Sequence, residues 1–500
     1  MRTHSTPVRG LMSAPRSPLF QGKFGRMFRS LPPATFGDND AQTDHNLEQL
    51  ALAMKSDPDA PKDGKDEEES GIPALYTYLG QFIDHDLTFD PASSLQKQND
   101  PSALTDFRTP AFDLDCVYGR GPDDQPYLFG DHGEFVFGAA LHNGHPGVRD
   151  LPRFLDAGDP TKGRALIGDP RNDENAIVSQ LQGLFMRFHN RLLADTGRPF
   201  AEVQQLLRFH YQYVVLHDFL PRVVHPSVLD LLRTHGHFDQ RKLEIYAWRN
   251  EPFMPVEFSG AAYRFGHSMV RPGYRLNDTT LLAIFPGLVG FRPADPERGI
   301  DWGRFIDIDI RSAEESDPAI TQKRLQFAYR IDTSFVDPLA HLPPSVAPTK
   351  PVSLGERNLK RGFRLGLPSG QAIARAMGVE PLEDREILIG KAVDAPQKPL
   401  PSILDTPGAD PGVFAGNCPL WTYVLAEAMR HREDVTIPVT EQVSVQTPML
   451  GPVGGRIVAE VFLGLMFGDP SSLLSLDPKW RPPSGKDYRL KDFVKYALGD

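Results

Sequence analysis

Residues 80–86 place an amide (Gln81), two carboxylates (Asp84 and Asp86) and an imidazole (His85) within seven positions. On a helix Gln81 lies one turn before Asp84 and His85, so these three polar groups share a face. The flanking residues are mostly apolar, which predicts that this face points into a buried cavity. A neutral imidazole can take and return a proton near pH 7, so we interpret His85 as an acid–base residue. A buried histidine with satisfied partners is the alternative at this point.

Two later segments, residues 168–193 and 263–277, carry further groups of this kind. Arg171 precedes a helix that we expect to start near residues 172–173, and a guanidinium is a permanent cation with a rigid fork of donors. It could stabilise developing negative charge, or it could be a surface arginine paired with Asp173. His267 has Arg264 three residues before it, which on a helix lies on the same face.

Together, the three segments resemble the haem peroxidases of the animal type, a superfamily with bacterial members (also called the peroxidase-cyclooxygenase superfamily). The matching motifs run from about residue 72 to about residue 470, in the family's order. The resemblance implies that His85 is the distal histidine, Arg171 the distal arginine and His267 the proximal iron ligand. It also implies that Asn358 hydrogen-bonds His267, although the Asn358 segment lacks the family's usual Arg-Asp-His-Gly ending.

The same resemblance assigns further contacts to haem b. Gln81 matches a distal glutamine associated with halide binding, and Arg264 is placed to reach a haem propionate. Asp84 and Glu174 match the two carboxylates that form ester bonds to haem methyl groups in the family, so ester-linked haem is expected; hydrogen bonding alone is the alternative. Asn175 stands where the leukocyte enzyme has a methionine that forms a third link, so no such link is expected.

Asp86 is expected to belong to a calcium site rather than to the cavity. The segment 108–119 resembles the family's calcium loop, and calcium prefers six to eight hard oxygen ligands. The candidate ligands are Asp86, Thr109, the carbonyl of Ala111, Asp113 and Asp115. An acidic turn that caps a helix is the alternative.

The resemblance implies a peroxidase that reduces hydrogen peroxide and oxidises halides, thiocyanate or small organic donors through an oxo-iron intermediate. A haem-dependent fatty-acid dioxygenase of the same fold is the main alternative. Such enzymes use a tyrosine three residues before the proximal histidine, where this chain has Arg264; Tyr263 is one residue off, or about 100° around a helix. A haem- and calcium-binding module without turnover would require a broken distal set, but Gln81, His85 and Arg171 are all present.

The implied haem-site residues, from His85 to Asn358, are scattered over almost 275 of the 500 positions, so one large domain must bring them together. We expect a mainly α, single-domain helical haem peroxidase fold with long loops and little β structure: an N-terminal arm over residues 1–40 and a catalytic domain over 41–500. Apolar residues recur at helical spacing in 177–192 and 203–216. The stretches 57–73, 338–355 and 394–414 are predicted loops, and the charged run 65–69 a solvated part of the first.

A net charge of −11 leaves no basic footprint for nucleic acid. The most apolar window, 457–468, is too short to span a bilayer and contains Glu460, so we expect no membrane span. A soluble monomer is expected, without a classical signal peptide, that is cytoplasmic or exported by a non-classical route. Cys116 and Cys418 cannot form a disulfide framework, but a single bridge between them stays open.

Overall fold

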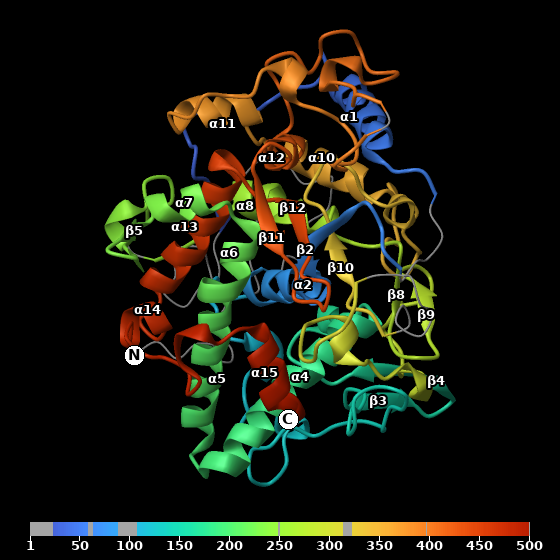
Figure 1. The fold of residues 1–500 in the computed structure, drawn as a ribbon, viewed down its shortest axis with the longest axis vertical. Coiled ribbons are helices and arrows are strands. Elements are labelled where there is room, and N and C mark those ends of the chain that lie inside the picture. Colours follow the sequence, from blue (N-terminus) through green and yellow to red (C-terminus); the bar gives the residue numbers. More distant parts are fainter. Residues whose placement is uncertain are drawn as a thin grey trace.

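The structure, a computed structural model, describes residues 24–58, 64–88, 108–248, 251–313, 323–396 and 398–499. Helices dominate these residues, and the predicted mainly α fold is confirmed (Figure 1). The α-helices are α1 (Asp40–Met54), α2 (Leu75–Leu87), α3 (Asp115–Tyr118), α4 (Ala176–Thr196), α5 (Phe200–Val214), α6 (Leu220–Val223), α7 (Pro226–Leu231), α8 (Val256–Gly260), α10 (Leu354–Arg364), α11 (Gly370–Ala376), α12 (Leu420–Ala428), α13 (Pro452–Gly468), α14 (Leu473–Leu476) and α15 (Leu490–Leu498).

The strands are short, and each sheet of the described chain contains two of them. The pairs are β1 (Phe24–Gly25) with β7 (Met254–Pro255), β2 (Glu69–Pro73) with β10 (Phe327–Tyr329), β3 (Arg153–Asp156) with β4 (Asp159–Ala165), β5 (Arg233–Thr234) with β6 (His237–Phe238), β8 (Gly273–Arg275) with β9 (Leu281–Ala283), and β11 (Arg432–Thr436) with β12 (Ser444–Pro448). Only β1–β7 is parallel; the other pairs are antiparallel.

The helix after Arg171 starts later than the sequence predicted. Residues Pro170–Asp173 form a 3₁₀ turn, η3, and α4 begins at Ala176. The Asn175 side chain accepts hydrogen bonds from the backbone N–H groups of Ile177 and Val178, which is the usual role of an N-cap residue. Because Asn175 satisfies these first donors, it and not residue 172 or 173 marks the helix start.

The sequence predicted a solvated loop over residues 65–69, and this prediction is wrong for the last residue. Glu69 opens strand β2 and is 7% exposed. Arg324 donates to both Glu69 oxygens, at 3.0 and 2.9 Å, and Arg271 donates to one of them. A buried carboxylate is retained when its charge is paired, so guanidinium groups from distant segments turn this acidic residue into a core residue.

One large hydrophobic cluster contains α2, α4, α5, α12 and α13, and α2 lies near the middle of the molecule (Figure 1). The most apolar window of the sequence lies in α13, which is buried almost throughout. Its Glu460 is fully buried, accepts hydrogen bonds from the backbone of residues 244–246 and pairs with Arg456 at 2.8 Å. Among the described residues, no helix has the length and apolar character needed to cross a membrane.

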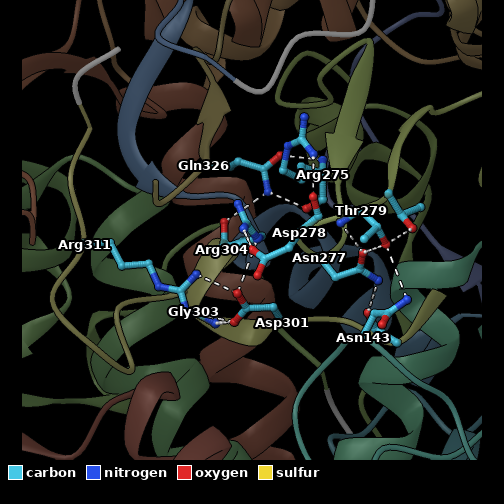
Figure 2. A network of polar contacts seen from close by, with 12 residues as sticks. Asn143, Arg275, Asn277, Asp278, Thr279, Asp301, Gly303, Arg304, Arg311 and Gln326 are labelled. Atoms are coloured by element: carbon cyan, nitrogen blue, oxygen red, sulfur yellow. Dashed lines mark hydrogen bonds and ion pairs between the residues drawn. The ribbon is translucent and has the colours of Figure 1, made fainter. Parts of the chain in front are cut away.

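A polar network fixes the segment that follows His267 (Figure 2). Gln326 accepts from the Arg275 N–H at 2.9 Å and donates to the Arg304 carbonyl at 3.2 Å. Asp301 pairs with Arg304 at 3.3 Å and with Arg311 at 2.8 Å. Gln326 immediately precedes β10, and β10 pairs with β2, the strand that leads into α2. The segment after His267 and the helix that carries His85 are therefore connected through this strand pair.

The described part of the N-terminal arm packs against the domain. The N–H groups of Met27 and Phe28 donate to the buried Glu257 of α8, at 3.1 and 3.2 Å. Arg26 donates to the carbonyls of residues 365–366, at 2.5 and 3.1 Å. The arm therefore joins α8 to the C-terminal end of α10, while the division at residue 40 stays a prediction.

The two cysteines do not form the bridge that the sequence left open. Cys116 and Cys418 are both free and buried. Each lies inside the hydrophobic core, where burial raises the pKa of the thiol. A buried neutral thiol packs as a small apolar group, so both cysteines are structural here.

Candidate functional site

A cavity of about 280 Å³ lies between α2, the start of α4 and the 3₁₀ helix η6 (Ala262–His267). Both candidate histidines line it, although 182 positions separate them in the sequence. Six of the predicted site residues line this one cavity: Gln81, Asp84, His85, Glu174, Arg264 and His267. Most of the remaining lining side chains are apolar or aromatic, as in a pocket for a large planar ligand.

The first imidazole, His85, is 4% exposed and has one ring nitrogen fixed. Its Nδ1 lies 2.7 Å from Asn172 Oδ1, and Asn172 Nδ2 donates to Gln182 Oε1 at 2.9 Å. With the Asn172 amide oriented as in the structure, Nδ1–H of His85 donates and Nε2 carries the lone pair. Burial, assisted by the positive charge of Arg171, lowers the pKa of His85 to about 4, which keeps the ring neutral at pH 7.

Asn172 is a site residue that the sequence analysis did not identify. It is fully buried and lies one position after Arg171, in η3. The signal that pointed to it was weak, because asparagine in a turn usually bonds to the local backbone. Its contact with His85 depends on η3 packing against α2, which sequence spacing does not reveal.

Glu174 and Gln81 form a second polar group beside His85. Gln81 Nε2 donates to Glu174 Oε1, and Asn175 Nδ2 donates to Gln81 Oε1 at 3.2 Å. Glu174 Oε1 is 4.0 Å from His85 Nε2. Burial raises the pKa of Glu174 to about 7, so near neutral pH this carboxyl exchanges between its protonated and ionised forms.

Asp84 lines the same cavity from α2, one residue before His85. Its backbone carbonyl accepts from the Thr88 N–H at 2.9 Å and from the Thr88 hydroxyl at 3.1 Å. The hydroxyl also lies 3.4 Å from Asp84 Oδ1. Asp84 from α2 and Glu174 from the segment between η3 and α4 thus line the same cavity.

Arg171 is not among the described residues that line the cavity. Its guanidinium donates to the buried Asp169, at 2.8 Å from Nη2, and to the backbone carbonyls of His85 and Thr88. These contacts hold the C-terminal end of α2 against η3. The positive charge of Arg171, close to His85, helps to lower the pKa of the imidazole.

The second imidazole, His267, ends η6 and lies 2.8 Å from Asn358 on α10. Burial, followed by the positive charge of Arg264, lowers the pKa of His267 to about 3. In a 3₁₀ helix residues three apart eclipse each other, so Arg264 and His267 point the same way and both line the cavity. A Cβ atom on Gly266 would meet no atom within 4 Å, so this backbone also faces open space.

On another side of α2, three buried carboxylates converge. Oxygen atoms of Asp86, Asp113 and Asp115 lie within 4.8 Å of one another. No described residue donates a hydrogen bond of ordinary geometry to the Asp86 carboxylate. Burial, with the charge of Asp113, raises the pKa of Asp86 to about 7, and Asp115 lies 3.3 Å from Arg108. Thr109 and Ala111 belong to the loop that leads to this cluster.

The animal haem peroxidase family model matches residues 96–388, which is more than half of the chain. The chain belongs to the animal haem peroxidase family. Among curated relatives, this family member is 31% identical to the chorion peroxidase of Aedes aegypti over 117 residues, which are 22% of this chain and 15% of that protein. It is 28% identical to human thyroid peroxidase over 124 residues, which are 23% and 12% of the two chains. The chain therefore spans less than a third of the length of the curated relatives it matches.

Solved structures show the same fold for this animal haem peroxidase family member. Peroxidase A from Dictyostelium discoideum aligns with a TM-score of 0.62 and 16% identity, over 96% of this chain and 93% of that one. The fatty acid alpha-dioxygenase of Oryza sativa aligns with a TM-score of 0.50 and 12% identity, over 99% of this chain and 84% of that one. Both similarities concern the fold, which peroxidases and dioxygenases share.

Proposed function

We propose that this protein binds haem in the cavity between α2 and η6 and is a peroxidase that reduces hydrogen peroxide. The observation that carries the proposal is that two buried imidazoles, His85 and His267, line one cavity together with Arg264 and two carboxylates. This donor set fits a haem, which needs an axial nitrogen, a base near the iron and a cation for its propionates. When bound, haem supplies a redox-active iron that peroxide can oxidise.

His85 is proposed to move the peroxide proton. Its Nε2 faces away from the hydrogen bond to Asn172, and the ring is neutral at pH 7, so Nε2 can accept a proton from the near peroxide oxygen and return it to the departing one. Arg171 supports this step through its charge, which keeps His85 unprotonated. The Arg171 guanidinium also donates to Asp169 and to the His85 and Thr88 carbonyls, so a direct hydrogen bond to the peroxide would have to form beside these bonds or in place of one of them.

His267 is proposed as the residue that would hold the haem iron, through Nε2. As oriented in the structure, Asn358 Nδ2 faces His267 Nδ1. A half-turn of the amide exchanges its nitrogen and oxygen, after which Nδ1–H donates to Oδ1 and the lone pair stays on Nε2. Such a hydrogen bond increases the basicity of an axial imidazole. Arg264, on the same face, is proposed to pair with a haem propionate.

The proposed reductants are halides, thiocyanate or small organic donors. Gln81 and Asn175 provide amide groups beside His85, which suit a small anion. The mainly apolar and aromatic remainder of the lining suits phenols and similar flat donors.

Stopped-flow mixing of peroxide with the haem-loaded protein tests the proposal. In His85→Ala, haem should stay bound while the peroxide-dependent change of the Soret band slows by at least roughly 100-fold, the scale of an acid–base contribution. In His267→Ala, the haem should be lost or its Soret and ferrous-CO spectra altered. Wild-type rates and spectra in both variants would contradict the assignment.

A fatty-acid dioxygenase is the second candidate because the alpha-dioxygenase fold aligns over the whole chain. Tyr263 is the nearest tyrosine to the required position, and its hydroxyl donates to the Gly80 carbonyl at 3.2 Å. The residue three positions before His267 is Arg264, so the peroxidase is favoured. Consumption of dissolved oxygen on addition of palmitate would instead support the dioxygenase.

We further propose that the three buried carboxylates bind calcium. The three buried carboxylates repel one another, Arg108 pairs with only one of them, Asp115, and no described residue donates a hydrogen bond of ordinary geometry to Asp86. Asp86, Asp113 and Asp115 would supply three hard oxygens. Thr109 and the Ala111 carbonyl, from the loop before Asp113, would supply others.

Ester links from Asp84 and Glu174 to haem methyl groups are proposed as well. Both carboxylates line the cavity, from α2 and from the segment before α4. Such links would hold the haem covalently and distort it, which raises its oxidising power.

A further inference from the structure

Three tyrosines, Tyr76, Tyr78 and Tyr263, line the cavity in the described part of the chain, and their surroundings differ. Tyr263 donates to the carbonyl of Gly80 at 3.2 Å. Tyr78 packs edge-to-face on Tyr274, with ring centroids 5.4 Å apart. Tyr76 alone among the three donates to a carboxylate, Asp218 Oδ2, at 2.5 Å.

Asp218 is placed for this contact by an irregular helix. Residues Val215–Phe219 form one turn of π-helix between α5 and α6, and such turns are frequent at functional sites. Asp218 is 3% exposed, accepts from Arg222 Nε at 2.8 Å and from the Leu490 N–H at 2.8 Å. These contacts fix the carboxylate beside the phenol, as a proton acceptor that does not need to move.

Arg222 contacts both Tyr76 and Asp218 and is partly exposed to solvent. Its guanidinium lies over the Tyr76 ring, 4.5 Å from the ring centre, and its side chain is 27% exposed. The Tyr76 ring itself is 1% exposed. One face of the buried ring thus lies under a partly exposed side chain, while the residue also lines the cavity.

We propose that Tyr76 is a redox-active tyrosine that carries single electrons between the haem cavity and the Arg222 side of the molecule. This inference rests on the proposed haem peroxidase function. Tyr76 gives one electron to haem that peroxide has oxidised, and its phenolic proton passes to Asp218, which leaves a neutral tyrosyl radical. An external one-electron donor then returns the electron, and Asp218 returns the proton. A phenol that loses an electron becomes strongly acidic. Of the three tyrosines, Tyr76 has a carboxylate, Asp218, that can accept its proton, so its oxidation does not create a buried positive charge.

Electron paramagnetic resonance of the haem-loaded protein, freeze-quenched after one equivalent of peroxide, tests the proposal. The parent protein should give a tyrosyl signal that Tyr76→Phe loses, while the matched controls Tyr78→Phe and Tyr263→Phe keep it. Asp218→Asn should weaken the signal although Tyr76 is present. An undiminished signal in Tyr76→Phe, or no tyrosyl signal in the parent, overturns the inference.

A shape-preserving replacement covers the case in which Tyr76→Phe does not fold. Fluorotyrosine at position 76 keeps the hydroxyl and should add fluorine hyperfine splitting to the signal; an unsplit signal overturns the proposal. The Soret band distinguishes the two levels of failure. If peroxide does not change it in the parent, the peroxidase function itself fails. If it changes normally but the radical does not depend on position 76, only this inference fails.

Discussion

At the scale of single residues, His85 depends on a neighbour from another element. The Asn172 amide hydrogen-bonds one ring nitrogen of His85 and restrains the ring, and Asn172 is itself hydrogen-bonded to Gln182. In enzymes of this kind the base must present one particular lone pair to the substrate. Asn172 is therefore a positioning residue, since it acts through His85.

Replacing Asn172 by alanine should slow the reaction with peroxide roughly 10- to 100-fold, the usual effect of losing a hydrogen bond that orients a metal-site histidine. The haem content should stay unchanged, because Asn172 is not among the described residues that line the cavity. Asn190→Ala is the matched control: Asn190 bonds the backbone of Phe135 and is not among the cavity-lining residues, so the rate should be that of the parent. Stopped-flow traces give both rates, and equal rates in the two variants would contradict the role of Asn172.

The carboxylates of Asp84 and Glu174 allow a second prediction at this scale. Brief peroxide treatment should convert haem into a form that acid-acetone does not extract, because ester formation is oxidative. Asp84→Val and Glu174→Gln should each remove one link, and the double variant should release all of its haem. If the double variant retains haem under denaturing conditions as the parent does, the two carboxylates only form hydrogen bonds.

At the scale of elements, α2 serves two sites through neighbouring residues. His85 points to the cavity and Asp86 to the carboxylate cluster, because successive helical positions are about 100° apart. A cation bound by Asp86 and the loop before α3 would fix the helix that carries the base. The proposed calcium site is thus linked to catalysis through the backbone of α2.

Asp113→Ala should lower both the calcium content and the melting temperature, since the cation that offsets the repulsion of Asp86 and Asp115 would bind less tightly. The exposed Asp123→Ala is the control and should change neither. Elemental analysis and thermal unfolding with and without a chelator measure the effect. Wild-type protein without calcium would refute the site.

The N-terminal arm links two elements of the proximal side. It bonds α8, which precedes His267, and the end of α10, which carries Asn358. Arg26→Ala removes charged donors to two carbonyls, so the free energy of unfolding should fall by about 1.5–3 kcal/mol. Arg29→Ala, which removes an exposed bond to a local carbonyl, should change it by less than about 0.5 kcal/mol. Denaturant unfolding compares the two; equal effects would show that the arm contact is unimportant.

At the scale of the whole molecule, buried ion pairs connect segments that are far apart in the chain. Glu69 at the start of β2 pairs with Arg271, after η6, and with Arg324, before β10. Both guanidinium groups are at most 1% exposed, so the single carboxylate compensates charge that water cannot reach.

Glu69→Gln should therefore cost about 3–5 kcal/mol of stability, because it leaves two buried cations without their carboxylate. The neighbouring exposed Glu67→Gln is the control and should be nearly neutral. Urea unfolding followed by circular dichroism measures the difference. A loss below about 1 kcal/mol in Glu69→Gln would mean that other contacts compensate the arginines.

Much of the candidate site could be predicted from the sequence because it consists of groups of residues that are close together in the chain. Helical spacing places Gln81, Asp84 and His85 together, and Arg264 with His267 three residues later, whatever the rest of the chain does. The mainly α character follows equally from local apolar periodicity. These features depend on residues within about one helical turn of each other.

Only the tertiary structure decided which elements that are distant in the sequence contact each other. Arg171 pairs with Asp169 and bonds backbone carbonyls of α2, and Asn172 rather than Arg171 contacts the ring of His85. Glu69 is a core residue because Arg324 and Arg271 reach it, although its charged surroundings in the sequence predicted a solvated loop. Whether a polar side chain is buried, and which group satisfies it, is set by the packing of elements that the chain brings together over tens to hundreds of residues. The spacing of residues in the sequence does not show which distant elements pack together. The sequence alone therefore determined which chemical groups lie close together locally, and the packing of the fold determined the direction in which each group points.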